Sequence, residues 1–170
     1  YICVYNPKNF SCMINRELYM EQITPFIDKP FVKVITGIRR CGKSVVLRLI
    51  REELLRRGVS EDYIIYMNFE SFEWIDMKEA KALYAHIREA TKASGKYYIL
   101  LDEIQEVTDW EKAVNAFLVD LDVDIYVTGS NSRLLSSEFS TYLAGRYVAF
   151  HIMTLSFKEY LLFHNLSLTI

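Results

Sequence analysis

The sequence predicts a doubly wound α/β domain, in which a parallel β-sheet is covered by helices on both faces. Three observations support this fold class: short apolar segments alternate with amphipathic ones, the short segments are apolar on both faces, and polar residues gather where they end. Strands that are apolar throughout are typical of parallel sheets buried between helices. Ligands bind beyond the carboxyl ends of such strands, so the polar residues there form the candidate site.

Five strands are predicted, and each is rich in β-branched and aromatic residues. They cover residues 31–35, 63–69, 96–103, 123–130 and 146–152. The first four lead into glycine or into polar side chains, as expected where a strand leaves a buried sheet for a loop.

Helices are predicted between the strands. Residues 43–57 repeat apolar side chains at helical spacing and stop at Gly58, and residues 131–143 are predicted as a later helix. Two further helices are preceded by residues with the spacing of a capping box, namely Asp76 with Glu79 and Thr108 with Glu111.

Composition sets limits on the class of protein. A chain of 170 residues suits one domain, and 20 basic against 22 acidic residues give no reason to propose a nucleic-acid partner. The apolar runs are far shorter than the roughly 20 residues that cross a bilayer, so no membrane partner is expected. The three cysteines, Cys3, Cys12 and Cys41, have no metal-ligand spacing and favour reduced thiols in the cytoplasm.

We divide the chain into four parts. Residues 1–12 are either a non-native, irregular leader or a native arm, and residues 13–30 form an N-terminal helical segment. Residues 31–152 are the core. Residues 153–170 are expected to begin a C-terminal lid region that is then cut short.

The segment from Gly37 to Ser44, "GIRRCGKS", fits the phosphate-binding pattern G-x-x-x-x-G-K-[ST] and stands between a predicted strand and a predicted helix. Glycines let the backbone N–H groups curl toward phosphate oxygens, and the helix adds the positive end of its dipole. Lys43 would reach the β- and γ-phosphates, and the Ser44 hydroxyl would bind Mg²⁺. The expected nucleotide-binding residues are Gly37, Ile38, Arg39, Arg40, Cys41, Gly42, Lys43, Ser44 and Val45.

Two acids, Asp102 and Glu103, end the third strand. A carboxylate at this position can hold the water shell of the Mg²⁺ that Ser44 binds, which makes Asp102 the second predicted metal ligand. Glu103 is placed to polarise an attacking water. A pair of solvated acids at a strand end is the alternative interpretation.

Four motifs together resemble a known family, the prokaryotic P-loop ATPases of the AAA type that usually carry a C-terminal restriction-endonuclease-like domain. These motifs are "ITGIRRCGKS", "YYILLDEIQEVTDWE", "VTGSNSRLLSSE" and "LAGRYVAFHIMTLSFKEYL". The resemblance implies a P-loop NTPase sandwich of three layers, with a five-stranded parallel sheet in the order 5-1-4-3-2. Thr154 departs from the family pattern, which usually has proline there.

The resemblance also implies roles for residues beyond the phosphate loop. A polar sensor of the γ-phosphate falls on Ser130 or Asn131, and the less favoured alternative is that these two residues simply make a turn after Gly129. Arg146 falls where the family has an arginine before its last core strand. It would stabilise transition-state charge within the chain or across to a neighbour, or would simply pair with a surface acid. Arg16 and Tyr19 match the family's "R-x-x-Y" element, which either contributes to the adenine pocket or, in the favoured interpretation, belongs to a helix that packs on the sheet.

The leading functional hypothesis is binding and Mg²⁺-dependent hydrolysis of ATP. Glu103, Lys43, Arg146 and Ser130 are the predicted catalytic residues. The alternative is a switch module that binds ATP or ADP, turns over little and acts through a missing C-terminal region on a partner, which could be DNA or a protein. Under either hypothesis the full-length form could be a homo-oligomer. Without the family's lid, we expect weak binding and slow turnover.

Because Cys41 lies beside a helix N-terminus, its thiol pKa is expected to fall, so that oxidation could block phosphate entry.

Overall fold

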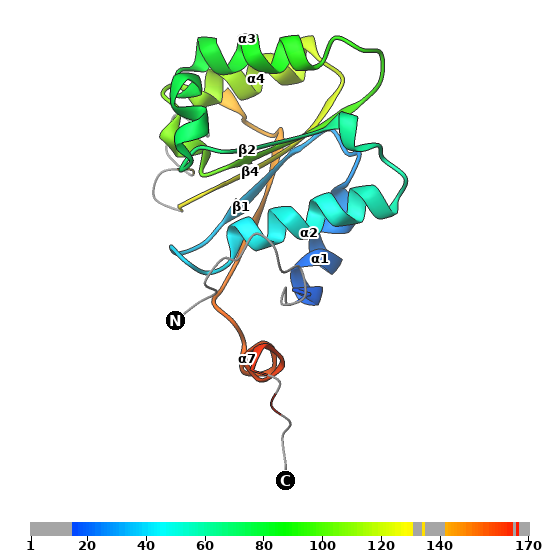
Figure 1. Cartoon of the computed structure of the whole chain (residues 1–170), viewed down its shortest axis with the longest axis vertical. Helices are drawn as coiled ribbons and strands as arrows, with labels where there is room; N and C mark the ends of the chain where they lie inside the picture. The colour runs from blue at the N-terminus through cyan, green and yellow to red at the C-terminus, as the bar shows by residue number, and fades with distance from the viewer. Residues whose placement is uncertain (1–14, 131–133, 135–141, 165, 167–170) are drawn as a thin grey trace.

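The computed structural model describes residues 15–130, 134, 142–164 and 166. Its centre is a five-stranded sheet whose neighbouring strands are all parallel, in the order β2-β3-β4-β1-β5 (Figure 1). The strands are β1 Val32–Thr36, β2 Ile64–Asn68, β3 Tyr97–Asp102, β4 Val123–Gly129 and β5 Tyr147–His151. The predicted sheet order is therefore confirmed.

Helices form a layer on each face of this sheet, so the predicted three-layer sandwich is also confirmed. Figure 1 shows α1 and α2 against one face, α3 and α4 against the other, and α7 beyond the end of β5, apart from both layers. The α-helices are α1 Glu17–Ile23, α2 Lys43–Arg56, α3 Ala80–Ala90, α4 Trp110–Asp120 and α7 Phe157–Phe163. Short 3₁₀ turns are η2 Thr24–Phe26, η3 Glu61–Tyr63, η4 Phe72–Met77 and η5 Ile104–Glu106.

Alternate strand residues pack into two separate hydrophobic clusters. On β3, Ile99 and Leu101 join the cluster under α3 and α4, whereas Leu100 joins the cluster under α1 and α2. Burial of each such side chain stabilises the fold by about 1.5–3 kcal/mol relative to exposure. The sheet is apolar on both faces because each face has its own helical layer to bury.

Neither predicted capping box forms. Asp76 lies within η4, and Glu79 is itself the residue before α3, with no side-chain bond to the helix. The residue before α4 is Asp109 in the left-handed conformation, with φ 56°. The reason is a parallel bridge between Glu79 and Thr108, in which the Thr108 carbonyl accepts the Ala80 N–H at 3.1 Å. This backbone pairing fixes both helix starts.

The helix predicted at residues 131–143 lies largely outside the described part of the chain.

A buried ion pair joins β1 to β4 near the amino ends of the strands. The ammonium group of Lys33 donates to the carboxylate of Asp124, and both side chains are almost fully buried. Lys33 also donates to the Lys29 carbonyl at 2.8 Å, while Asp124 Oδ2 accepts from the Tyr126 hydroxyl and the Asp28 N–H, each at 2.8 Å. Burial lowers the pKa of Lys33, and the negative charge of Asp124 opposes that shift.

No helix in the described ranges combines the length and the apolar character needed to cross a membrane.

Replacing Lys33 by methionine should leave the Asp124 charge buried without its counter-ion. We expect Lys33→Met to lower the free energy of unfolding by about 3–5 kcal/mol, and the double variant Lys33→Met/Asp124→Leu to lose less, because no isolated charge remains. Urea unfolding at neutral pH measures both values. A loss for Lys33→Met below about 1 kcal/mol, the range of exposed pairs, would contradict a fully buried interaction.

Candidate functional site

The predicted phosphate loop connects β1 to α2, as the motif requires. Gly37 opens the loop in a confined place: an added Cβ would lie 2.4 Å from the Ile152 carbonyl oxygen and 2.6 Å from the Cys41 sulfur. Gly42 precedes α2 with φ 101°, and its carbonyl accepts the Val46 N–H at 3.1 Å. Contact at the first glycine and a positive φ at the second therefore explain why this loop needs both.

Lys43 lies in the first turn of α2 with its side chain folded back over the loop. Its Nζ atom is 3.4 Å from the Gly37 carbonyl oxygen and 3.2 Å from Glu103 Oε1, and the side chain is 4% exposed. Phosphate oxygens that entered the loop would compete with Glu103 for this ammonium group.

Asp102 lies at the carboxyl end of β3 and is completely buried. Its Oδ1 accepts from the Thr128 hydroxyl at 2.5 Å, and its Oδ2 accepts from the Tyr66 hydroxyl at 3.1 Å. Burial, together with this carboxylate, raises the pKa of Tyr66. Two neutral donors thus fix the direction of the carboxylate without cancelling its charge, which suits it to a hydrated cation.

Glu103 follows in the left-handed conformation, with φ 55°. This geometry turns its side chain out of the sheet, where Oε1 meets Lys43 and Oε2 accepts from Gln105 Nε2 at 2.6 Å. The Glu103 N–H donates to the Thr128 hydroxyl oxygen at 2.9 Å. The loop lysine and the strand-end carboxylate, 60 residues apart in sequence, are therefore in direct contact.

Other predicted site residues lie around this centre. Ser44 is half-buried in the first turn of α2, and Val45 follows it in the helix. Ile38 is 62% exposed, and Arg40 has φ 67°, so the loop bulges outward between its glycines.

The remaining predicted residues are not brought to Lys43. Arg39 is exposed and lies 3.6 Å from Glu70. Ser130 follows β4 and accepts the Leu134 N–H through its carbonyl at 3.0 Å, and Asn131 is outside the described residues. Arg146 precedes β5, a strand that pairs directly with β1, and donates to Asn115 at 3.1 Å. It lies at the amino end of these strands, whereas Lys43 lies beyond their carboxyl end. This placement does not favour action on a nucleotide in the same chain, and action across an interface stays a prediction.

Sequence reasoning missed three contributors to the site. Thr128 bridges Asp102 to the backbone of Glu103, Gln105 holds the Glu103 carboxylate, and Tyr66 holds Asp102. The position of Thr128 within an apolar strand gives only a weak signal of a role in the site, because threonine is β-branched and is common in ordinary strands. The motif "DEIQ" does contain Gln105, but only the left-handed turn at Glu103 brings their side chains together.

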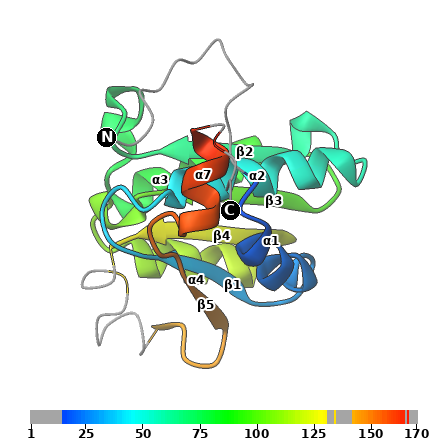
Figure 2. The same cartoon turned by 90° about the horizontal axis from the view of Figure 1, so that it is seen from below.

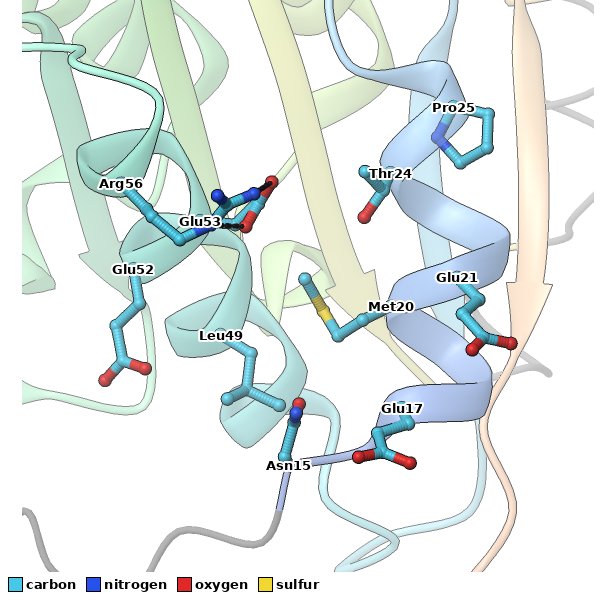
Figure 3. Close-up of a pocket in the computed structure, with 10 residues that line it drawn as sticks. All are labelled: Asn15, Glu17, Met20, Glu21, Thr24, Pro25, Leu49, Glu52, Glu53 and Arg56. Carbon is cyan, nitrogen blue, oxygen red and sulfur yellow. Dashed lines mark hydrogen bonds and ion pairs between the residues drawn. The ribbon is translucent and has the colours of Figure 1, made fainter.

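A groove of about 860 Å³ opens between α1 and α2 (Figure 3), and none of the phosphate-loop residues 37–44 lines it. It is lined by Asn15, Glu17, Met20, Glu21, Thr24, Pro25, Leu49, Glu52, Glu53 and Arg56. Four carboxylates against one guanidinium, which itself pairs with Glu53, make this lining negative. A triphosphate would be repelled there, so the groove is not the candidate phosphate site.

The pKa of Cys41 moves in the opposite direction from the one expected. The thiol is 3% exposed, and its burial raises the pKa above the ordinary value, although Lys43 and Arg16 oppose that shift. The expectation from a helix N-terminus was wrong because desolvation disfavours the thiolate more than the nearby positive charges favour it.

Cys41 should therefore react slowly while the protein is folded. We expect alkylation by iodoacetamide near pH 8 to be at least about tenfold slower in the native chain than in urea, since the thiolate is the reactive form. Mass spectrometry of peptides separates Cys41 from Cys3 and Cys12. Equal rates in the two states, or loss of nucleotide binding after mild peroxide, would show an accessible thiol instead.

Comparison with known proteins identifies relatives. An uncharacterized protein of Haemophilus influenzae is 49% identical over 150 residues, and one of Methanocaldococcus jannaschii is 35% identical over 153 residues. These alignments include 88% and 90% of this chain but only 38% and 32% of the two relatives. The chain thus spans well under half the length of the relatives that it matches.

Solved structures share the fold at low sequence identity. AMPPCP-bound DnaA from Aquifex aeolicus has a TM-score of 0.61 at 19% identity, covering 92% of this chain and 55% of that one. A RuvB variant from Thermotoga maritima has a TM-score of 0.58 at 14% identity, covering 89% and 49%. A family model described as an AAA domain matches residues 29–161. Since that match takes in most of the sequence, the chain belongs to the AAA domain family.

Proposed function

We propose that this domain binds ATP together with Mg²⁺ and hydrolyses the bond between the β- and γ-phosphates. The observation that carries the proposal is the 3.2 Å contact between Lys43 Nζ and Glu103 Oε1, which joins a phosphate-binding lysine to a carboxylate able to orient water. Membership of the AAA domain family and the AMPPCP bound to the similar DnaA structure support the choice of an adenine nucleotide.

Each part of the site has a role in this proposal. The backbone N–H groups of the loop from Gly37 to Val45 surround the phosphates, and Lys43 exchanges its contact with Glu103 for one with phosphate oxygens. The Ser44 hydroxyl and the Asp102 carboxylate would hold Mg²⁺, which when bound offsets the negative charge of the phosphates. In the described ranges no three His, Cys, Asp or Glu residues cluster as a ligand set, so phosphate and water oxygens would complete the coordination shell.

Glu103 performs the step that separates hydrolysis from binding. Once Lys43 has turned to the phosphates, one Glu103 oxygen is available to accept a hydrogen bond from water while the other is held by Gln105. The water oxygen forms a bond to the γ-phosphorus as a water proton passes to the free Glu103 oxygen, and the bridging oxygen leaves on ADP with the electron pair of the broken bond. Ser130, Asn131 and Arg146 remain predicted contributors to γ-phosphate recognition and charge stabilisation.

Glu103→Gln should separate binding from turnover. We expect ATP to bind as tightly as in the wild type or more tightly, because Lys43 loses a competing partner, while turnover falls on the order of 100-fold or more. Equilibrium binding of a fluorescent ATP analogue and steady-state phosphate release, both in the full-length natural protein, measure the two effects. Lys43→Ala should abolish binding.

A matched control is Glu89→Gln, since Glu89 is exposed near the end of α3 and pairs with Lys92. It should leave both quantities unchanged. ATP binding with undetectable turnover in the wild type would instead support the nucleotide-dependent switch, and absence of ATP binding would refute both functions.

Thr128→Val tests the support under the two acids. Valine keeps the shape of threonine but leaves Asp102 Oδ1 and the Glu103 N–H without the hydroxyl they share. We expect a loss of about 1–3 kcal/mol in unfolding free energy, together with slower phosphate release. Thr91→Val also removes a hydroxyl bond, to the Ile87 carbonyl in α3, and should leave phosphate release unaffected. Equal effects of the two variants on turnover would contradict a specific role for Thr128.

A further inference from the structure

Arg16 places a charged side chain in the interior, next to the phosphate loop. It precedes α1, and its side chain is 2% exposed. Nη1 donates to the Cys41 carbonyl at 2.9 Å, Nη2 donates to the Met153 carbonyl at 2.8 Å, and Nε lies 2.8 Å from Glu159 Oε1. The guanidinium carbon is also 4.6 Å from the centre of the Tyr19 ring. One side chain therefore joins three parts of the chain: the start of α1, the phosphate loop and the segment that follows β5.

The first partner is part of the phosphate loop. A peptide group is planar and trans, so its carbonyl and the following N–H point in opposite directions. Because the Cys41 carbonyl faces Arg16, the Gly42 N–H faces away from it. Arg16 thus sets the orientation of one of the loop amides that the proposed function directs at phosphate. An added Cβ on Gly42 would lie only 3.1 Å from Nη1, so the guanidinium packs closely against this peptide.

The other partners belong to the segment that follows β5. Met153 lies directly beyond the strand, and its N–H donates to the Tyr19 hydroxyl at 3.0 Å. Glu159 lies in the first turn of α7, where its second oxygen accepts the Ser156 N–H at 2.7 Å and the Ser156 hydroxyl accepts the Glu159 N–H at 3.3 Å. One carboxylate therefore caps α7 and binds Arg16 at the same time. Viewed from below, α7 lies in front of the sheet near the entry to α1 (Figure 2).

We propose that Arg16 is a positioning residue of the phosphate site, which orients the Cys41–Gly42 peptide and couples it to the segment from Met153 to Glu159. The inference rests on the proposed binding of ATP and goes beyond it, because it links nucleotide occupancy to the packing of α7. Phosphate bound to the loop favours the peptide orientation that Arg16 holds, and that same arrangement favours α7 in place. The coupling is reciprocal: the factor by which bound nucleotide favours the docked position of α7 is also the factor by which docked α7 strengthens nucleotide binding. A change that releases α7 must therefore weaken nucleotide binding.

The test compares Arg16→Met with Glu159→Gln. Glutamine at the third helical position still serves a capping box, so Glu159→Gln keeps the start of α7 while removing the charge that pairs with Arg16. We expect the dissociation constant of an ATP analogue with Mg²⁺ to rise about 10-fold or more for Arg16→Met and about 3-fold or more for Glu159→Gln, as typical coupling strengths allow. Turnover at saturating ATP should change less than the KM. Arg16→Lys, which keeps the charge but not the planar fork, should be intermediate.

Hydrogen exchange gives a readout that a purely structural role would not change. In the wild type, binding of the analogue should slow amide exchange in peptides covering 153–163, and this effect should be lost in Glu159→Gln. Arg51→Met is the matched control, because Arg51 pairs with Glu61 at the surface of α2, away from the loop. It should retain wild-type affinity and wild-type exchange. Thermal unfolding identifies any variant that does not fold, and Glu159→Gln keeps the test decisive if Arg16→Met fails.

Two results overturn different conclusions. If the wild type binds the analogue and folded Glu159→Gln shows the same affinity and the same nucleotide-dependent protection of α7, the role of Arg16 is refuted while the proposed function stands. If the wild type binds no nucleotide, the proposed function itself fails, and this inference fails with it.

Discussion

Parallel pairing of β1 with β4 and of β4 with β3 is the constraint on which the site depends. Thr36 pairs with Gly129 on one side of this arrangement, and Leu101 pairs with Val127 on the other, so the strands end at one level. The phosphate loop and the two acids belong to strands that are not neighbours. They meet because β4 lies between these two strands. Thr128, the second-last residue of β4, contacts both Asp102 and the Glu103 backbone.

Buried charge occurs at both ends of this sheet, and the two cases differ in a way that indicates their roles. At the amino end, Lys33 and Asp124 have protein partners on all sides: a carbonyl, a hydroxyl and an N–H complete the ion pair. At the carboxyl end, Lys43 has a long contact with a carbonyl and a contact with Glu103, whose side chain is 16% exposed. The first network is closed and structural. The second is partly open to solvent at Glu103, as the proposed exchange of Lys43 from Glu103 to phosphate requires.

The fold and the centre of the site could be predicted from sequence because both depend on local patterns. Apolar runs with β-branched residues locate the strands, and the spacing from Gly37 to Ser44 locates the loop. Val46 and Ile50 give α2 an apolar face, which is a similar local signal. The helix predicted from it, residues 43–57, differs from α2 by one residue at its carboxyl end.

What could not be predicted depends on contacts between distant segments. The capping boxes failed because Glu79 and Thr108 pair through their backbones across two loops, which no spacing within either loop reveals. The thiol pKa of Cys41 depends on the burial of this side chain in the folded loop, which the local sequence does not reveal. The sequence pattern around Arg16 favoured simple helix packing, and helix packing does occur through Tyr19 and Ile23, yet the guanidinium has a separate set of partners.

Burial of Arg16 has a cost that simple packing would not require. A charge removed from water is compensated only by well-directed partners, and an apolar side chain of similar volume often stabilises a fold equally well. Stability alone therefore does not account for an arginine whose fork reaches a loop carbonyl, a strand-exit carbonyl and a carboxylate. Its planar geometry does something an apolar side chain cannot: it specifies the relative orientation of three backbone segments. Because one of them bears the amides proposed to bind phosphate, Arg16 holds the backbone at the place where the proposed chemistry needs a fixed orientation.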